Sequence, residues 1–349
     1  MAGLSGLAAR AAITLQTHWW SARPTGLART LRPLSWLYGG LAALQRAQAA
    51  EPSAPVPVIV VGNLVVGGAG KTPTVIALVQ ALQAAGHRPG VLSRGYGRQG
   101  STVIEVRQGL DAVAVGDEPL LIYRRTGVPV WVGADRVATA RALCAAHPEV
   151  DVLVSDDGLQ HHALARVAEV VVFDDRGAGN GMVLPAGPLR QPMPARLRPG
   201  AFVLYTGTRA STPLPGALAA RALGRAWPLA AWWRGDAPAA RPIDEFLGRT
   251  VLAAAGLAAP EKFFAMLEAV GLTLQRLPVP DHASFDALPW PAAATWDVLV
   301  TEKDAVKLQP GRPGNERVWV VPLDFALPAE LVRALIARLP GPLPLPPTV

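Results

Sequence analysis

The chain has little cysteine and no long apolar run. Its only cysteine, Cys144, excludes an internal disulfide framework and fits a reducing compartment, and its Ala-rich surroundings assign it to helix packing. No run reaches the roughly 18–20 apolar residues of a membrane-spanning helix, because the stretch Leu34–Leu44 is short and contains two glycines. Arg10 interrupts the first apolar residues and no basic segment precedes them, which argues against a secretory signal peptide. We therefore expect a protein on the cytoplasmic side, soluble or peripheral.

Acidic residues are absent from residues 1–50, although the whole chain has a net charge of only +7. A basic, acid-free and aromatic composition is typical of a segment that lies on an anionic membrane surface. A helix pair packed on the body of the protein is the alternative, and both can hold at once. Nucleic acid is another partner for basic charge, but the many aliphatic residues argue against it. The residues concerned are Arg10, Arg23, Arg29, Arg32, Arg46, Trp19, Trp20, Trp36 and Tyr38.

Apolar residues make up 50% of the chain, which is ample for a large core, and they occur in short runs that alternate with helical stretches. Continuous apolar strands between helices predict an α/β fold, a mostly parallel sheet with helices on both faces. The expected strands are 58–61, 90–93, 128–132, 152–155, 170–173 and 202–205, and the expected helices lie near 75–85, 118–125 and 136–146.

A second, shorter alternation of strands and helices follows a stretch with little periodicity. It predicts strands at 251–255, 298–301 and 318–321 and helices at 260–270 and 328–338. We therefore divide the chain into an N-terminal helical, membrane-facing segment (1–50), a P-loop NTPase-like core (51–206), a linking region (207–248), a smaller C-terminal α/β lobe (249–338) and a proline-rich tail (339–349) that we expect to be frayed.

A glycine-rich turn follows the first predicted strand directly. The run Gly67-Gly68-Ala69-Gly70-Lys71-Thr72 leads into an Ala/Leu-rich helix, so its backbone N–H groups and the positive helix end would face one anion. Lys71 would reach the β- and γ-phosphates, and Thr72 would offer its hydroxyl to Mg²⁺. The P-loop pattern expects a glycine at position 65, where this chain has Val65. A plain glycine turn is the alternative, but the strand–loop–helix context favours a nucleotide phosphate site.

Pairs of carboxylates lie at the ends of two further elements of the predicted core. Asp156-Asp157 ends an apolar strand, which is where a P-loop enzyme keeps the acid that binds Mg²⁺; an Asx turn before Gly158 is the alternative. Asp117-Glu118 opens a helix, where Asp117 would be an ordinary N-cap or would accept the proton of an attacking hydroxyl. Phosphoryl transfer depends on such a base less than on positioning and charge neutralisation.

Two further groups of residues fit a phosphate-transfer site less specifically. Asp281-His282 lies between prolines in the smaller lobe and could close over the P-loop to share a proton with an acid there; most loop histidines are simply solvated. Arginine side chains suit phosphate oxygens, although each one singly is more often a surface charge. The candidates at predicted strand ends or in Gly/Pro-flanked stretches are Arg94, Arg98, Arg136 and Arg190.

Taken together, these segments resemble the tetraacyldisaccharide 4′-kinase family, the lipid A 4′-kinases, from about Trp19 to Lys307. Their order and joint presence are far more specific than the P-loop alone. The chain departs from the family pattern at Val167 and Gln191, where an acid is common, and we expect these changes to affect local salt bridges only. The matching stretches are 33–39, 62–73, 93–97, 116–119, 156–161, 184–190, 281–282 and 301–304.

The resemblance implies transfer of the ATP γ-phosphoryl group to the 4′-hydroxyl of a tetraacylated disaccharide 1-phosphate. It also implies a peripheral enzyme on the cytoplasmic face of the inner membrane of a Gram-negative bacterium. Asp117 would be the base, assisted by His282. The expected ATP-binding residues are Gly67, Gly68, Ala69, Gly70, Lys71, Thr72, Arg94 and Arg190, and the expected Mg²⁺ ligands are Thr72, Glu118 and Asp157.

Two other functions stay open at this point. A P-loop ATPase or GTPase could act as a nucleotide switch on a protein or metal partner, and Thr301-Glu302-Lys303-Asp304 is a near miss of the segment that reads guanine. A non-catalytic peripheral membrane protein with a vestigial loop is the third reading. Competition between ATP and GTP would test the second function, and a phosphorylated lipid product would exclude the third.

Overall fold

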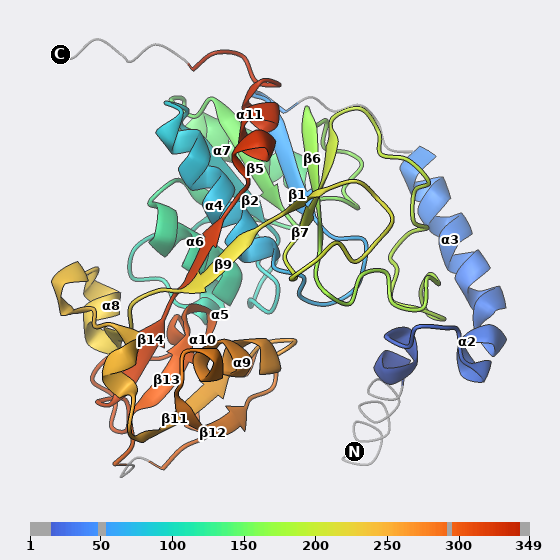
Figure 1. Ribbon diagram of the computed structural model, residues 1–349. Coiled ribbons are helices and arrows are strands. Elements are labelled where there is room, and N and C mark those ends of the chain that lie inside the picture. Colours follow the sequence, from blue (N-terminus) through green and yellow to red (C-terminus); the bar gives the residue numbers. More distant parts are fainter. Residues whose placement is uncertain (1–14, 48–53, 292–294, 343–349) are drawn as a thin grey trace, which may run out of the picture.

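Two β-sheets, joined by a two-stranded ribbon, form the body of the protein (Figure 1). The computed structural model describes residues 15–47, 54–291 and 295–342. The first part of the predicted N-terminal segment and most of the predicted tail therefore lie outside the described residues.

The larger sheet has eight strands in the order β3-β4-β2-β5-β1-β6-β7-β8, and all neighbours are parallel except β3 and β4. The connection after β1 runs toward β2, while the connection after β5 runs to β6 on the other side, so a crevice opens at the carboxyl ends of β1 and β5. This sheet confirms the predicted mostly parallel α/β core. Its strands are β1 (Val58–Gly62), β2 (Pro89–Ser93), β3 (Ile104–Glu105), β4 (Val130–Val132), β5 (Val152–Asp156), β6 (Ala168–Phe173), β7 (Ala201–Tyr205) and β8 (Ala217–Leu218).

Helices cover both faces of the larger sheet because its strands are apolar on both sides. Ile59 and Val61 of β1 join a core cluster with α4 (Lys71–Ala84) and α6 (Asp117–Thr126). Val58 and Val60 point the other way, into a cluster with α7 (Arg136–Ala146) and the loops that flank it. The short helix α5 (Ala112–Val115) precedes α6 directly.

The smaller sheet has the strand order β10-β14-β13-β11-β12, parallel except for β10. Helix α9 covers one face, and α8 and α10 lie on the side where this core merges with that of the larger sheet. The elements are β10 (Trp227–Pro228), α8 (Leu229–Arg234), η1 (Ala237–Ala239), η2 (Ile243–Phe246), β11 (Thr250–Ala255), α9 (Glu261–Ala269), β12 (Thr273–Pro278), β13 (Val298–Thr301), α10 (Glu302–Ala305) and β14 (Val318–Val321).

The predicted linking region 207–248 is more ordered than its sequence indicates. It supplies the edge strands β8 and β10 of the two sheets, the helix α8, and β9 (Ala220–Leu223), which pairs antiparallel with β15 (Leu323–Ala326). These strands have two to four residues, too few for a period of two to stand out in an Ala/Pro-rich stretch. The β9–β15 ribbon crosses between the lobes (Figure 1).

The last described helix belongs with the larger sheet rather than with the smaller lobe, contrary to the predicted boundary at 338. Helix α11 (Ala329–Ile336) contacts α4, and its buried Leu331 and Leu335 join the core cluster that holds α4 and continues into the smaller sheet. Figure 1 shows α11 beside α4, above the ribbon. A helical pattern identifies an amphipathic face but not the sheet that covers it, which explains this error.

The N-terminal segment carries α2 (Gly26–Thr30) and α3 (Arg32–Ala47), which lie along the side of the larger sheet in Figure 1. In the part of the chain that the structure describes, no helix combines the length and the apolarity needed to cross a bilayer.

Candidate active site

The glycine-rich turn after β1 is held with its carbonyl groups turned toward the protein. The carbonyl of Gly67 accepts a hydrogen bond from Asn63 Nδ2 (2.9 Å), that of Gly68 from Arg176 Nη2 (2.6 Å), and that of Ala69 from Thr206 Oγ1 (2.9 Å). A planar trans peptide directs its N–H opposite to its C=O, so the amide N–H groups that follow these carbonyls point away from their partners. The turn can therefore offer several N–H donors to one anion.

Gly70 needs to be glycine at the start of α4. Its φ of +88° lies in the left-handed region, and a Cβ there would meet Thr206 at 3.0 Å. Helix α4 begins directly after it, at Lys71. The first N–H groups of a helix have no acceptor within the helix, so they add to the donors of the turn.

The missing glycine of the P-loop pattern is explained by a neighbouring loop. Residues 180–190, which we call the bracing loop, hold the chain extended on both sides of Val65: Arg190 N donates to Leu64 O (2.7 Å) and Val66 N to Pro188 O (2.9 Å). Val65 itself is fully buried and bridges to Leu189. An extended, buried position favours a β-branched residue over glycine.

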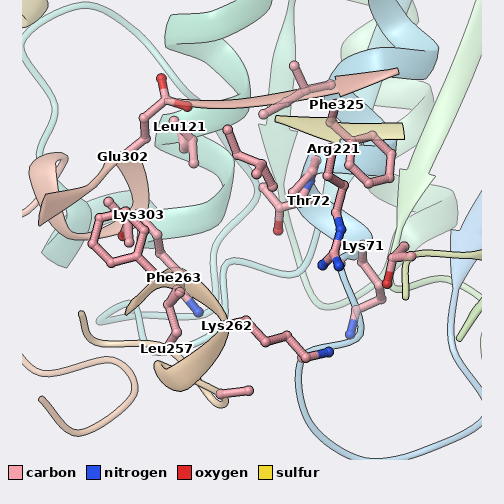
Figure 2. A pocket seen from close by; sticks show the side chains of 18 of the residues that line it. Lys71, Thr72, Leu121, Arg221, Leu257, Lys262, Phe263, Glu302, Lys303 and Phe325 are labelled. Atoms are coloured by element: carbon pink, nitrogen blue, oxygen red, sulfur yellow. The ribbon is translucent and has the colours of Figure 1, made fainter. Parts of the chain in front are cut away.

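A cavity of about 240 Å³ lies between the glycine-rich turn and the smaller lobe. Figure 2 shows the polar side of this cavity, where the side chains of Lys71, Thr72, Arg221 and Lys262 lie close together. The walls away from the turn are mostly apolar and come from α4, α6, α9 and the ribbon: Ile76, Leu121, Leu223, Phe263, Met266 and Phe325. A charged end and an apolar end suit a nucleotide, with phosphates at one and base at the other.

Three cations from different elements line the polar side. Lys71 Nζ lies 3.4 Å from Asn63 Oδ1 and 3.7 Å from Asp157 Oδ1, and Lys262 Nζ lies 3.0 Å from Asp174 Oδ2. The side chain of Arg221 on β9 has no hydrogen-bond or ion-pair partner among the described residues, and its guanidinium points toward Lys71 in Figure 2. Two of these cations also act on Asp175, which lies 3.4 Å from Lys262 Nζ. Burial would raise the pKa of Asp175, but the backbone N–H of Thr208 and the charges of Lys262 and Arg221 lower it.

The two aspartates at the end of β5 have different surroundings. Asp157, with φ +50°, accepts from Arg190 Nη1 at 3.0 Å and lies near Lys71. Asp156 is buried, and among the described residues its Oδ1 has no hydrogen-bond partner. Burial, together with the negative charges of Glu118 and Asp157, raises the pKa of Asp156 to about 7. A site that disfavours its own negative charge is one that an added cation would stabilise.

Asp117 and His282 form a hydrogen-bonded pair beside the cavity, although they come from different lobes. The Nδ1 of His282 lies 3.0 Å from Asp117 Oδ2, while Asp117 Oδ1 accepts from the backbone N–H of Glu118. Burial alone would raise the pKa of Asp117, but the His282 hydrogen bond and the charge of Lys303 lower it. The same hydrogen bond raises the pKa of His282. The pair therefore favours a carboxylate facing an imidazolium.

Comparison with known proteins now identifies the family. The family model described as tetraacyldisaccharide-1-phosphate 4′-kinase matches residues 27–340. The chain belongs to this family. Curated tetraacyldisaccharide 4′-kinases are similar over nearly the whole chain. The protein of Methylibium petroleiphilum is 56% identical over 310 residues, covering 86% of each chain, and that of Leptothrix cholodnii is 51% identical, covering 97% of this chain and 99% of the relative.

A solved structure of the tetraacyldisaccharide 4′-kinase family has the same fold. It is the crystal structure of LpxK from Aquifex aeolicus in complex with ATP, with a TM-score of 0.74 and 26% identity, covering 90% of this chain and 99% of that chain. The family resemblance and the P-loop kinase fold predicted from the sequence are thereby confirmed, and the kinase is favoured over the nucleotide switch.

The structure brings most of the predicted residues of this 4′-kinase family member to one place. Gly68, Ala69, Gly70, Lys71, Thr72 and Glu118 line the cavity, and Asp117, Asp157, Arg190 and His282 lie next to it through the contacts given above. Gly67 and Arg94 are not among the lining residues, and Arg94 is exposed at the end of β2. Their roles in ATP binding stay predictions.

Sequence reasoning missed the cations that come from outside the core. Arg221 lies in the Ala/Pro-rich stretch that was predicted as an irregular link, and Lys262 lies in a helix of the smaller lobe. Neither belongs to a motif, so only the approach of the ribbon and the smaller lobe to the glycine-rich turn reveals them.

Residues 301–304, which resemble a guanine-reading segment, have a structural role in the smaller lobe. Asp304 is fully buried, and its Oδ2 accepts from Gly256 N (2.9 Å) and lies 2.7 Å from Thr301 Oγ1. Its carboxylate therefore caps a turn of the smaller lobe rather than facing a ligand.

Proposed function

We propose that this protein transfers the γ-phosphoryl group of ATP to the 4′-hydroxyl of a tetraacyldisaccharide 1-phosphate. The observation that carries the proposal is the Asp117–His282 pair, 3.0 Å apart, beside a cavity lined by the glycine-rich turn. The turn supplies donors for a triphosphate, and the pair supplies a proton acceptor next to it. The family to which the chain belongs supports the same reaction.

In the proposed reaction the 4′-oxygen attacks the γ-phosphorus, the bond from the γ-phosphorus to the β–γ bridging oxygen breaks, and ADP leaves. The hydroxyl proton passes to Asp117, whose ionised form is favoured by His282. A carboxylate of lowered pKa is a weak base, which suits a loose transition state in which the proton leaves late. Most of the acceleration then comes from positioning and from cations around the phosphates.

Mg²⁺ fits the acid cluster at the carboxyl end of β5. Within residues 15–47, 54–291 and 295–342 no three ligating side chains are grouped to hold a metal ion by themselves, and kinase magnesium is commonly held by one or two carboxylates together with substrate phosphates. The unpartnered Oδ1 of Asp156 supports Asp156 as a ligand. Thr72 and Glu118, which line the cavity, would complete the set, and Glu118 would share its carboxylate with Lys303. The predicted ligand Asp157 is engaged by Arg190 and Lys71. When bound, the ion would neutralise charge on the β- and γ-phosphates.

Arg221 would contact the phosphates from the ribbon. We expect Arg221→Gln to raise the KM for ATP about tenfold, because a hydrogen bond to a charged group is worth about 1.5–3 kcal/mol. Steady-state kinetics at varied ATP would measure it. Arg225→Gln is a matched control, since Arg225 donates to Ala240 O and does not line the cavity. An unchanged KM in Arg221→Gln would remove Arg221 from the phosphate site.

The N-terminal helices would dock the enzyme on the inner leaflet. Ser35 ties α3 to the bracing loop, donating to Val183 O (2.8 Å) and accepting from Ala186 N (3.2 Å). Most other large side chains of α3 are exposed, with Trp36 at 66% and Leu37 at 63%. An apolar helix surface flanked by arginines supports binding to an anionic bilayer, on the cytoplasmic face of the inner membrane. The relatives named above come from Gram-negative bacteria.

The docking proposal predicts a loss of vesicle binding. Replacing Trp36, Leu37 and Leu41 with serine is expected to lower binding to anionic phospholipid vesicles by at least about tenfold, since each buried apolar side chain contributes of order 1 kcal/mol or more. Co-sedimentation measures it. Leu247→Ser, at an equally apolar exposed position of the smaller lobe, should sediment like the wild type. Equal sedimentation of the triple variant would refute docking through α3.

Mass spectrometry tests the proposed reaction itself. The wild-type protein with ATP, Mg²⁺ and a tetraacyldisaccharide 1-phosphate should yield a product heavier by one phosphoryl group. A tenfold excess of GTP should not abolish the yield. ATP hydrolysis without any phosphorylated lipid would favour the nucleotide switch instead.

A further inference from the structure

One lysine joins the two lobes next to the Asp117–His282 pair. Lys303, in α10 of the smaller lobe, places its Nζ 3.3 Å from Glu118 Oε1 and 3.0 Å from Asp281 Oδ1. Its side chain is only 16% exposed. Glu118 follows Asp117 on α6, and Asp281 precedes His282 in the loop after β12. The ammonium therefore binds the immediate neighbours of both members of the pair.

The loop that carries His282 needs such support. His282 has φ +60°, in the left-handed region that is unfavourable for a residue with a Cβ. Besides Asp117, its ring meets Tyr96, whose ring centroid is 5.1 Å away and which is itself exposed. A charge-assisted hydrogen bond holds its partners more firmly than a contact with an exposed ring does. Without Lys303, the carboxylates of Glu118 and Asp281 would lose the ammonium that bonds to both, and the His282 ring, 3.8 Å from Asp281 Oδ1, would be left to offset their repulsion.

We infer that Lys303 is a positioning residue that fixes the 281–282 segment against α6, so that His282 meets Asp117. The inference rests on the proposed function, in which Asp117 receives the proton. Lys303 lines the cavity, as Lys71, Lys262 and Arg221 do, but its ammonium bonds to the two carboxylates that flank the pair. Its role in this inference is therefore to act through His282 rather than to bind the phosphates.

Kinetics of Lys303→Met test the inference. We expect kcat to fall about 10–100-fold, as for other residues that orient a reacting group, with the KM for ATP within about twofold of the wild type. Lys303→Arg keeps the charge and should recover part of the loss. Because Lys303 acts through His282, the double variant with His282→Ala should be no slower than the slower single variant.

Arg276→Gln is a matched control from the same lobe, since Arg276 is paired with Glu261 and Glu268 away from α6. In the double variant with His282→Ala, the fold losses in kcat of the two single variants should multiply. Three results would overturn the inference: a Lys303→Met enzyme with wild-type kcat, a KM for ATP that rises while kcat is kept, or multiplying losses in the Lys303→Met, His282→Ala double variant.

A structure of Lys303→Met separates this inference from the proposed function. We expect His282 Nδ1 to move out of hydrogen-bond distance of Asp117, a result that needs no activity. A contact kept at about the present 3.0 Å would refute the positioning role even in an active enzyme. Conversely, a wild-type protein that makes no phosphorylated lipid would refute the proposed function and leave this structural test standing. Thermal unfolding of each variant checks that it folds.

Discussion

Lys71→Ala is expected to lower kcat/KM for ATP about a thousandfold, since removing one preorganised donor to developing charge costs about 10²–10³ and Lys71 also contributes to binding. Lys71 is the cation that starts α4, and Asn63 and Asp157 hold its ammonium at the cavity. Lys262 is already engaged by Asp174, and Arg221 reaches the cavity from the ribbon rather than from α4, so neither takes the position of the Lys71 ammonium.

Steady-state kinetics and calorimetric ATP binding would measure the loss. The fold should survive, because Asp157 keeps its ion pair with Arg190 at 3.0 Å, so the thermal midpoint serves as the control. A kcat/KM within about threefold of the wild type would contradict phosphate binding by the glycine-rich turn.

Asp117→Asn is expected to lower kcat by about 10²–10⁴, the range for a lost proton acceptor, with little change in ATP affinity. The amide has the shape of the carboxylate and can keep a hydrogen bond to His282, so the change removes the proton acceptor more than the packing. Asp117 is 6% exposed and takes its place from the first turn of α6. In the described part of the chain its two oxygens bond to His282 and to the backbone N–H of Glu118, not to the glycine-rich turn, so nucleotide binding should persist.

Asp111→Asn is the matched control. Asp111 caps the neighbouring helix α5 through Ala114 N, and asparagine caps a helix about as well as aspartate does. Full activity in this variant, against a strong loss in Asp117→Asn, would assign the effect to the proton acceptor. An Asp117→Asn enzyme with nearly normal kcat would place the base elsewhere, and His282 would be the next candidate to replace.

The sequence predicted the parts of the site that rest on local pattern. A buried strand followed by glycines, Lys71 and a helix favours a phosphate site over a plain glycine turn. Asp156-Asp157 ends a strand, where a parallel sheet binds its ligands. Asp117 and His282 were predicted because family resemblance linked them across 165 residues. Periodicity and spacing could not have shown that these two side chains meet, because their contact depends on how the smaller lobe packs against α6.

The cations Arg221 and Lys262, the ribbon and the placement of α11 could not be predicted from the sequence for the same reason. Each depends on a contact between segments far apart in the chain, such as Leu323 with Leu223 in the ribbon register. Strands of two to four residues leave no pattern to read. The membrane-facing role of residues 1–50 was predicted from their composition and stays a prediction, and the structure leaves Trp36 and Leu37 of α3 exposed.

The bracing loop has a consequence for how a lipid reaches this enzyme. On one side it receives Trp19 Nε1 at Pro185 O and Ser35 at Val183 O, and on the other its Arg190 N and Pro188 O hold the strand that leads into the glycine-rich turn. The N-terminal helices and the glycine-rich turn are thus held by the same short loop. In the proposed docking, this loop would set the height of the reaction centre above the bilayer, and the sugar headgroup would have to rise from the leaflet to meet it.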